Sequence, residues 1–99
     1  MDYRIIWSPE ALMQLGRVVR YIARDNPAAA EKVGNAIIDK CLVLGNFPRL
    51  GKVFRKMARD DIREISVPPY RIIYSISDNE KAIEILTVWH GARQEPEVL

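Results

Sequence analysis

The stretch REISVPPYRIIYSI, residues 63–76, decides the fold because it is typical of two strands joined by a tight turn. Apolar and polar residues alternate before Pro68-Pro69, and the segment after the prolines is rich in β-forming residues. A symmetric turn about the two prolines would place Ser66 opposite Arg71. The sequence therefore predicts an antiparallel hairpin in the second half of the chain.

Two helices are predicted before this hairpin. Ser8 is a good N-cap followed by proline and glutamate, and an apolar stripe then continues to about residue 24. Asn26 repeats the same start signal before a second proline, and Gly45 ends the second stripe. The very short connection between the two segments predicts an antiparallel helical hairpin.

Three further segments are typical of strands. Tyr3–Trp7 is short and rich in β-formers, Ala82–Trp89 is apolar on both faces, and a weaker strand is predicted near Val53–Lys56. Because both of its faces are apolar, the 82–89 strand is expected in the interior of the sheet. The order β-α-α-β-β-β predicts an α+β fold, in which a small antiparallel sheet carries the N-terminal helical hairpin on one face.

Length and composition predict one domain over residues 1–99, since 99 residues with 48% hydrophobic content are typical of a single globular unit. No apolar run reaches the ~18 residues that a membrane span needs, and the N-terminus lacks the features of a signal peptide. We therefore expect a cytoplasmic protein without membrane contact. One histidine and one cysteine predict no metal site, and no cofactor-binding motif is present.

The registers of the two hairpins predict which polar side chains share the face of the sheet away from the helices. If Ile76 lies opposite Ile83, then Arg71 faces Val88 and His90 lies diagonal to Arg71. The polar set on that face is then Glu64, Ser66, Arg71 and His90. Two plainer interpretations stay open. His90 would bind a backbone carbonyl at the strand end, and Arg71 would pair with Glu64.

Positive charge is concentrated in the middle of the chain. Residues 48–72 hold seven basic side chains and three acidic ones, whereas the whole chain has a net charge of only +2. This pattern favours an acidic or phosphate-bearing partner, although a solvated loop would have the same composition. The candidate partner-binding residues are Arg49, Lys52, Arg55 and Arg63. Val19 and Ile38 lie off the central stripes of their helices and are candidates for contact with a partner segment.

Five segments, taken in order, resemble landmarks of the RelE/ParE family of toxins from bacterial type II toxin–antitoxin modules. They are IIWSPEALMQL, YIARDNPAAA, FPRLGK, REISVPPYRIIYSI and ILTVWHGAR, and the likeness covers nearly the whole chain. The resemblance implies the order of elements predicted above, a cognate antitoxin protein as partner, and growth arrest as the cellular effect. It also implies that DNA is bound only through the antitoxin.

The resembled family divides by target. ParE-like members block DNA gyrase, whereas RelE-like members cut mRNA in the ribosomal A site with lysines, arginines and a C-terminal tyrosine. Arg71 and Arg93 match the arginine positions, but Glu64 and Ser66 stand near the lysine positions and no tyrosine follows. This departure favours inhibition of gyrase as the expected function. The alternatives are a ribosome-dependent mRNA endoribonuclease and a member that binds an antitoxin without toxicity.

Some ribonuclease members of the resembled family use a glutamate, an arginine and a C-terminal histidine. If this chain is a ribonuclease, its catalytic set would be Glu64, Arg71, His90 and Arg93. Glu64 would then take the proton of the RNA 2′-OH, and His90 would protonate the leaving 5′-oxygen. Arg71 and Arg63 would hold the phosphate as negative charge develops on it.

Overall fold

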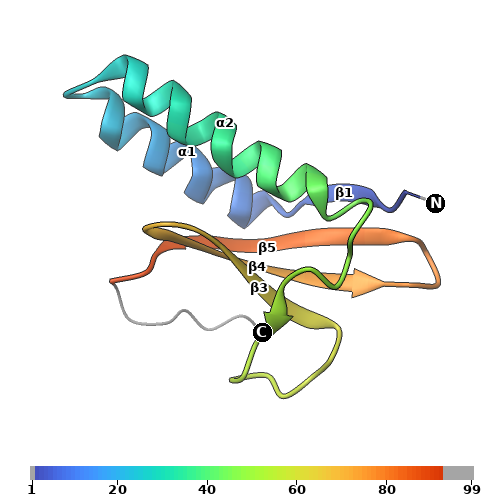
Figure 1. The fold of residues 1–99 in the computed structure, drawn as a ribbon. Coiled ribbons are helices and arrows are strands. Elements are labelled where there is room, and N and C mark those ends of the chain that lie inside the picture. The colour runs from blue at the N-terminus through green and yellow to red at the C-terminus, as the bar shows by residue number, and fades with distance from the viewer. Residues whose placement is uncertain (1, 93–99) are drawn as a thin grey trace.

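The computed structural model describes residues 2–92, in which a helical layer packs on one sheet (Figure 1). Within these residues the elements are β1 (Arg4–Trp7), α1 (Pro9–Ala23), α2 (Pro27–Val43), β2 (Lys52–Val53), β3 (Ile62–Val67), β4 (Tyr70–Ser77) and β5 (Ala82–His90). The predicted α+β fold, with the helical hairpin on one face of the sheet, is confirmed. The weak strand predicted near Val53–Lys56 is the two-residue β2.

The sheet is mixed rather than wholly antiparallel. Its strand order is β1-β5-β4-β3-β2, and β1 runs parallel to β5 while the other neighbours are antiparallel. The predicted antiparallel sheet is therefore wrong for this one pair. Turn signals specify strands joined by hairpins, but they do not specify the direction of two strands that pair across most of the chain. Strand β5 lies between β1 and β4, so its predicted interior position is confirmed.

Both helices begin where the cap signals predict. Ser8 Oγ accepts a hydrogen bond from Ala11 N at 3.0 Å, and Asn26 Oδ1 accepts one from Ala29 N at 3.0 Å. A proline follows each cap at the first helical position. The backbone N–H that proline lacks would have no partner within the helix there. No helix among residues 2–92 is long and apolar enough to cross a bilayer.

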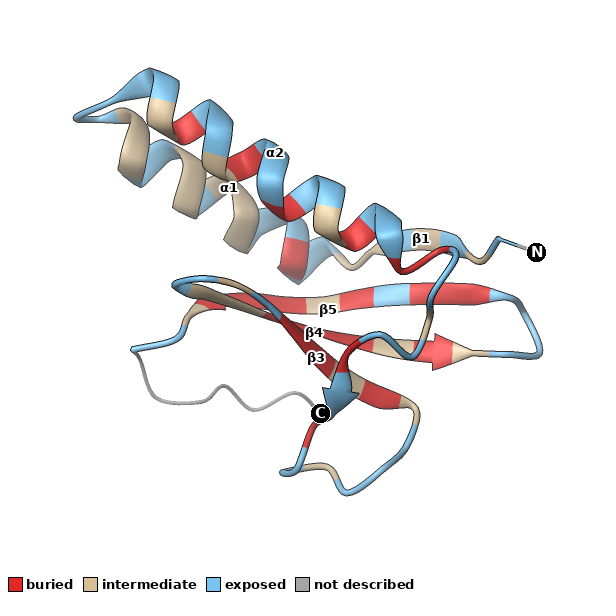
Figure 2. Cartoon of the chain, in the orientation of Figure 1, coloured by how far each residue is buried: buried red, intermediate tan, exposed pale blue. Residues whose placement is uncertain are grey.

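Apolar side chains pack on both faces of the sheet, and Figure 2 shows buried residues along the central strands. The core between the helices and the sheet includes Cys41 and Ile72, and burial raises the pKa of the Cys41 thiol to about 12. On the opposite face, which we call the outer face, Phe54 packs with Ile73 and Trp89. The outer face is therefore covered in part by the loop after β2.

Candidate functional site

A β-bulge in β5 decides where the predicted polar residues lie. Ile76 pairs with Ile83 as predicted, but Ile73 pairs with Thr87, so Leu86 is an extra residue in β5. Beyond Leu86 the register is shifted by one. A shift of one residue directs each later side chain to the other face of the sheet.

Helix α1 holds this bulge. Gln14 Oε1 accepts hydrogen bonds from the Val88 backbone N–H at 2.7 Å and from the Thr87 hydroxyl at 2.9 Å. Ser8 Oγ donates to the Leu86 carbonyl at 3.2 Å. Gln14 was not among the predicted site residues. Its only signal in the sequence is a polar side chain close to the apolar stripe of a helix, which is a weak signal by itself.

The shifted register separates His90 from Arg71. Arg71 pairs with Trp89, and its guanidinium carbon lies 4.8 Å from the centroid of the Trp89 ring on the outer face. His90 pairs with Tyr70, and their rings meet edge to face with centroids 5.5 Å apart on the helix side. The predictions that Arg71 faces Val88 and that His90 shares the outer face are therefore wrong, because the hairpin pattern does not reveal the extra residue.

On the outer face, Arg71 and Glu64 form a hydrogen-bonded ion pair. Arg71 Nε donates to Glu64 Oε2 at 2.9 Å, and a terminal N–H of Arg71 donates to the same oxygen. Glu64 is only 6% exposed, and the Lys52 ammonium lies 3.9 Å from its other oxygen. The pairing of Arg71 with Glu64, one of the two plainer interpretations, is confirmed. Ser66 lies opposite Arg71, as the turn predicts.

On the helix side, His90 lies at a pocket of about 390 Å³ between α1 and the ends of β4 and β5. The Ala92 backbone N–H donates to His90 Nδ1 at 3.1 Å. In the neutral ring the proton therefore lies on Nε2, which is a donor. The predicted bond from His90 to a backbone carbonyl is replaced by this bond from a backbone amide.

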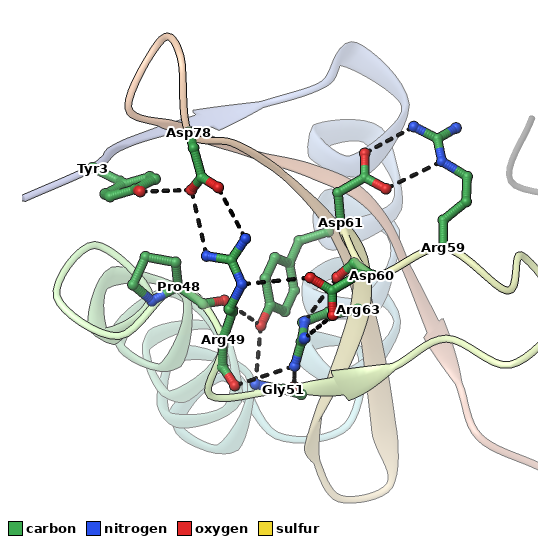
Figure 3. Close-up of polar contacts among 10 residues, drawn as sticks. Tyr3, Pro48, Arg49, Gly51, Arg59, Asp60, Asp61, Arg63 and Asp78 are labelled. Carbon is green, nitrogen blue, oxygen red and sulfur yellow. Dashed lines mark hydrogen bonds and ion pairs between the residues drawn. The ribbon is translucent and has the colours of Figure 1, made fainter.

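Two of the predicted partner-binding arginines bind acidic residues within the chain (Figure 3). Arg49 donates to Asp78 in the turn after β4 at 2.9 Å and lies 3.6 Å from Asp60. Arg63 pairs with Asp60 and donates to the Gly51 carbonyl at 2.9 Å, with only 13% of its side chain exposed. The hydrogen bond from Arg49 holds the pKa of Asp78 below its usual range. Arg49 and Arg63 therefore join three loops, and partner binding by them stays a prediction.

The other two basic candidates are more accessible. Lys52 lies exposed on the edge strand β2, and Arg55 lies exposed in the loop that follows. Within residues 2–92, the Arg55 side chain makes no ion pair or hydrogen bond. An exposed, unpaired arginine keeps its full donor set for a phosphate or a carboxylate. Arg55 is thus the strongest of the four predicted partner-binding residues.

Tyr74, which was not among the predicted site residues, anchors the loop between α2 and β2. Its hydroxyl donates to the Pro48 carbonyl at 2.7 Å and accepts from the Gly51 N–H at 2.9 Å. Burial raises the pKa of this hydroxyl. A Cβ added at Gly51 would lie 2.5 Å from the Glu64 carbonyl oxygen, so glycine is needed for the close approach to β3.

The two residues predicted to meet a partner segment differ in position. Val19 is half-buried, and its Cγ2 would lie 3.1 Å from a Cβ added at Gly34, so it packs between the helices. Its predicted place off the helix seam is wrong, because the small Gly34 lets the helices approach there. Ile38 is 39% exposed, as predicted for a contact residue. Further exposed apolar residues of α2 and the following loop are Leu42, Val43, Phe47 and Leu50.

The predicted ribonuclease set is not brought together within the described residues. Glu64 and Arg71 contact each other, whereas His90 lies across the sheet and Arg93 lies outside residues 2–92. In the same range, no group of three His, Cys, Asp or Glu residues is placed to hold a metal ion. Within residues 2–92, the predicted site residues therefore lie in two separate groups, one on each side of the sheet.

Three kinds of comparison with known proteins place the chain. The sequence profile of the ParE toxin of type II toxin-antitoxin system, parDE, matches residues 5–95. The protein Y4kP of Sinorhizobium fredii is 35% identical over 96 residues, covering 97% of this chain and 96% of its own. Toxin RelE2 of Caulobacter vibrioides is 29% identical over 91 residues, covering 91% of this chain and 97% of its own.

Solved structures share the fold at low sequence identity. The chromosomal ParDE system from P. aeruginosa matches with a TM-score of 0.71 at 17% identity, covering 90% of this chain and 96% of that one. The RelBE2 toxin–antitoxin complex from Mycobacterium tuberculosis matches with a TM-score of 0.68 at 22% identity, covering 91% and 99%. The profile match over residues 5–95, together with the fold, shows that this chain belongs to the RelE/ParE family of type II toxin–antitoxin toxins.

Proposed function

We propose that this chain is a ParE-like toxin that arrests growth by inhibiting DNA gyrase in the cytoplasm and is neutralised by a cognate antitoxin. The observation that carries this proposal is the separation of His90 from Glu64 and Arg71 by the sheet. Cleavage by an RNA 2′-OH needs a base, positive charge and an acid around one phosphate. Inhibition of an enzyme by binding needs only a complementary surface.

Ribosome-dependent mRNA cleavage is the second candidate function. The observation in its favour is the cluster of Glu64, Arg71 and Lys52 on the outer face, where a carboxylate and two cations lie together. Arg93 would add a further cation in this reading. The cluster lacks an acid for the leaving oxygen within residues 2–92, which is why this function ranks second.

The proposed antitoxin has an apolar surface and an open sheet edge to bind. Ile38 and the exposed apolar residues after it suit the apolar face of an amphipathic helix, and the edge strand β2 suits an added strand. Binding of the antitoxin should then slow hydrogen exchange in α2 or in β2. Protection confined to the turn at residues 78–81 would contradict this docking mode.

Supercoiling of relaxed plasmid DNA by gyrase, with and without the purified chain, tests the target. We expect the chain to inhibit supercoiling and the antitoxin to reverse this inhibition. His90→Ala should leave the inhibition largely intact, whereas Arg55→Glu should weaken it. Unchanged supercoiling together with cleavage of mRNA on ribosomes would replace this proposal with the second candidate. Expression without growth arrest, in a strain that lacks the antitoxin, would instead indicate a member without toxicity.

A further inference from the structure

The pocket beside His90 is lined by hydrogen-bond donors and aromatic rings, and we call it the α1 pocket. Among residues 2–92, its polar and aromatic lining consists of Gln14, Arg17, Tyr21, Tyr70, Trp89 and His90. No aspartate or glutamate of the described part of the chain is among its lining residues. A cavity of about 390 Å³ with this lining is large enough for one or two amino-acid side chains.

The α1 pocket depends on the bulge in β5. If β5 ran on without a bulge, Leu86 would lie opposite Ile73 and Trp89 opposite Tyr70, so Trp89 rather than His90 would point to the helix side. Gln14, which lines the pocket, accepts a hydrogen bond from the backbone N–H of Val88, two residues after the bulge. Bulges often redirect a side chain next to a functional site. The chain therefore holds His90 at this pocket through specific contacts that span the fold.

The donors at the α1 pocket are available. His90 Nδ1 is occupied by the Ala92 amide, which leaves the Nε2 proton as its donor. Both hydrogen bonds of Gln14 use its oxygen, and its amide N–H groups make no bond within residues 2–92. Arg17 is exposed and makes no ion pair within the same range. An anionic group in the pocket would meet the permanent positive charge of Arg17 and two neutral donors, the Nε2–H of His90 and the side-chain amide of Gln14.

The rim of the α1 pocket favours a protein as the occupant. Met13, Arg17 and Tyr21 lie four residues apart on one stripe of α1, and Tyr21 is 70% exposed. Methionine, arginine and tyrosine are enriched in protein interfaces, and arginine and tyrosine often carry much of the binding energy. Nucleic acid binding would call for several cations that follow the phosphates, but within residues 2–92 Arg17 is the only lysine or arginine in the lining.

We propose that the α1 pocket binds the carboxylate of an acidic side chain in a partly apolar segment of a partner protein. Arg17 and His90 would donate to the carboxylate, and the tyrosine rings would pack on the neighbouring apolar side chain. This inference is independent of whether gyrase is the target, because it uses only the chemistry of the pocket.

Nuclear magnetic resonance titration of the full chain tests this proposal. The probe is N-acetyl-Leu-Glu-amide, with N-acetyl-Leu-Gln-amide as its neutral match and hexathymidylate as the nucleic acid. We expect the glutamate dipeptide to bind with a dissociation constant on the order of 1 mM and to shift the amides of residues 14–21 and 88–92. The glutamine dipeptide should bind about tenfold more weakly.

Two charge-matched variants of α1 give the control. Arg17→Gln should weaken binding of the glutamate dipeptide about tenfold, whereas Arg24→Gln, at the end of the same helix and outside the pocket, should not. His90→Ala should weaken it as well, while its thermal unfolding shows that the chain is still folded. Equal binding of the two dipeptides, equal effects of the two arginine variants, tighter binding of hexathymidylate, or no shift with any probe would overturn the proposal.

Discussion

The two faces of the sheet hold their polar residues differently at the end of β5. On the outer face, Arg71 is held by a buried carboxylate and lies over an indole ring. On the helix side, His90 accepts a hydrogen bond from a backbone amide, meets the edge of a tyrosine ring and lies at a pocket. The outer face is thus an arrangement in which opposite charges satisfy each other, whereas the helix side presents donors to a cavity. The bulge at Leu86 decides that Trp89 lies on the outer face and His90 on the helix side.

The most severe way to break this difference is to insert an alanine between Thr87 and Val88. Val88 would then lie opposite Arg71 and Trp89 opposite Tyr70, so these two buried side chains would exchange faces. We expect a loss of about 4 kcal/mol or more in the free energy of unfolding, measured by urea denaturation. Insertion of an alanine after Asn79, in the exposed turn between β4 and β5, is the matched control, with a smaller loss. Similar losses for both insertions would mean that the register of β5 does not fix these faces.

Arg71→Ala should distinguish the charged outer face from the helix side. Among the described residues it would leave the buried Glu64 carboxylate with the more distant Lys52 as its one ion-pair partner, and it would remove the contact with Trp89. Breaking such a pair costs about 3 kcal/mol, because the remaining charge stays out of water. His90→Ala should change stability by less than about 1 kcal/mol. Denaturant titration of both variants checks this order, and a larger loss for His90→Ala would contradict it.

Gln14→Leu should loosen the bulge itself. The Val88 N–H and the Thr87 hydroxyl would lose their acceptor in a partly buried place, which costs about 2 kcal/mol. Gln14→Glu keeps an oxygen in the same position and should recover most of the loss. Hydrogen exchange at the Val88 amide reports the change directly. If the Val88 amide exchanges equally slowly in Gln14→Leu, Gln14 does not hold the bulge.

The smallest expected effect lies outside both faces, in the exposed Arg49–Asp78 pair. The pKa of Asp78 is lowered in the folded chain, first by its hydrogen bond from Arg49. The pair therefore adds stability above the unfolded pKa of aspartate, and this stability is lost as the pH falls through the folded pKa. Asp78→Asn should lower the Tm slightly at neutral pH and not in strong acid. A Tm difference that is constant with pH would show that the charge of Asp78 is not the cause.

Local sequence patterns determined most of the fold. Ser8 and Asn26 each cap a helix before a proline, and the Pro68-Pro69 turn sets Ser66 opposite Arg71. These features depend on residues a few positions apart, so the sequence shows them directly. The parallel pairing of β1 with β5 did not follow, because it joins segments near the two ends of the chain.

The candidate site was predicted only in part, for the same reason. The adjacency of Glu64 and Arg71 follows from a short hairpin and was anticipated. The place of His90 depends on an extra residue in β5. The nearby Val88 amide donates to Gln14, which lies 74 positions earlier in the chain. The sequence by itself therefore determined the helices, the hairpins and the family resemblance. Only the tertiary structure decided which face receives the histidine, because the register of a strand end depends on which distant groups satisfy its backbone.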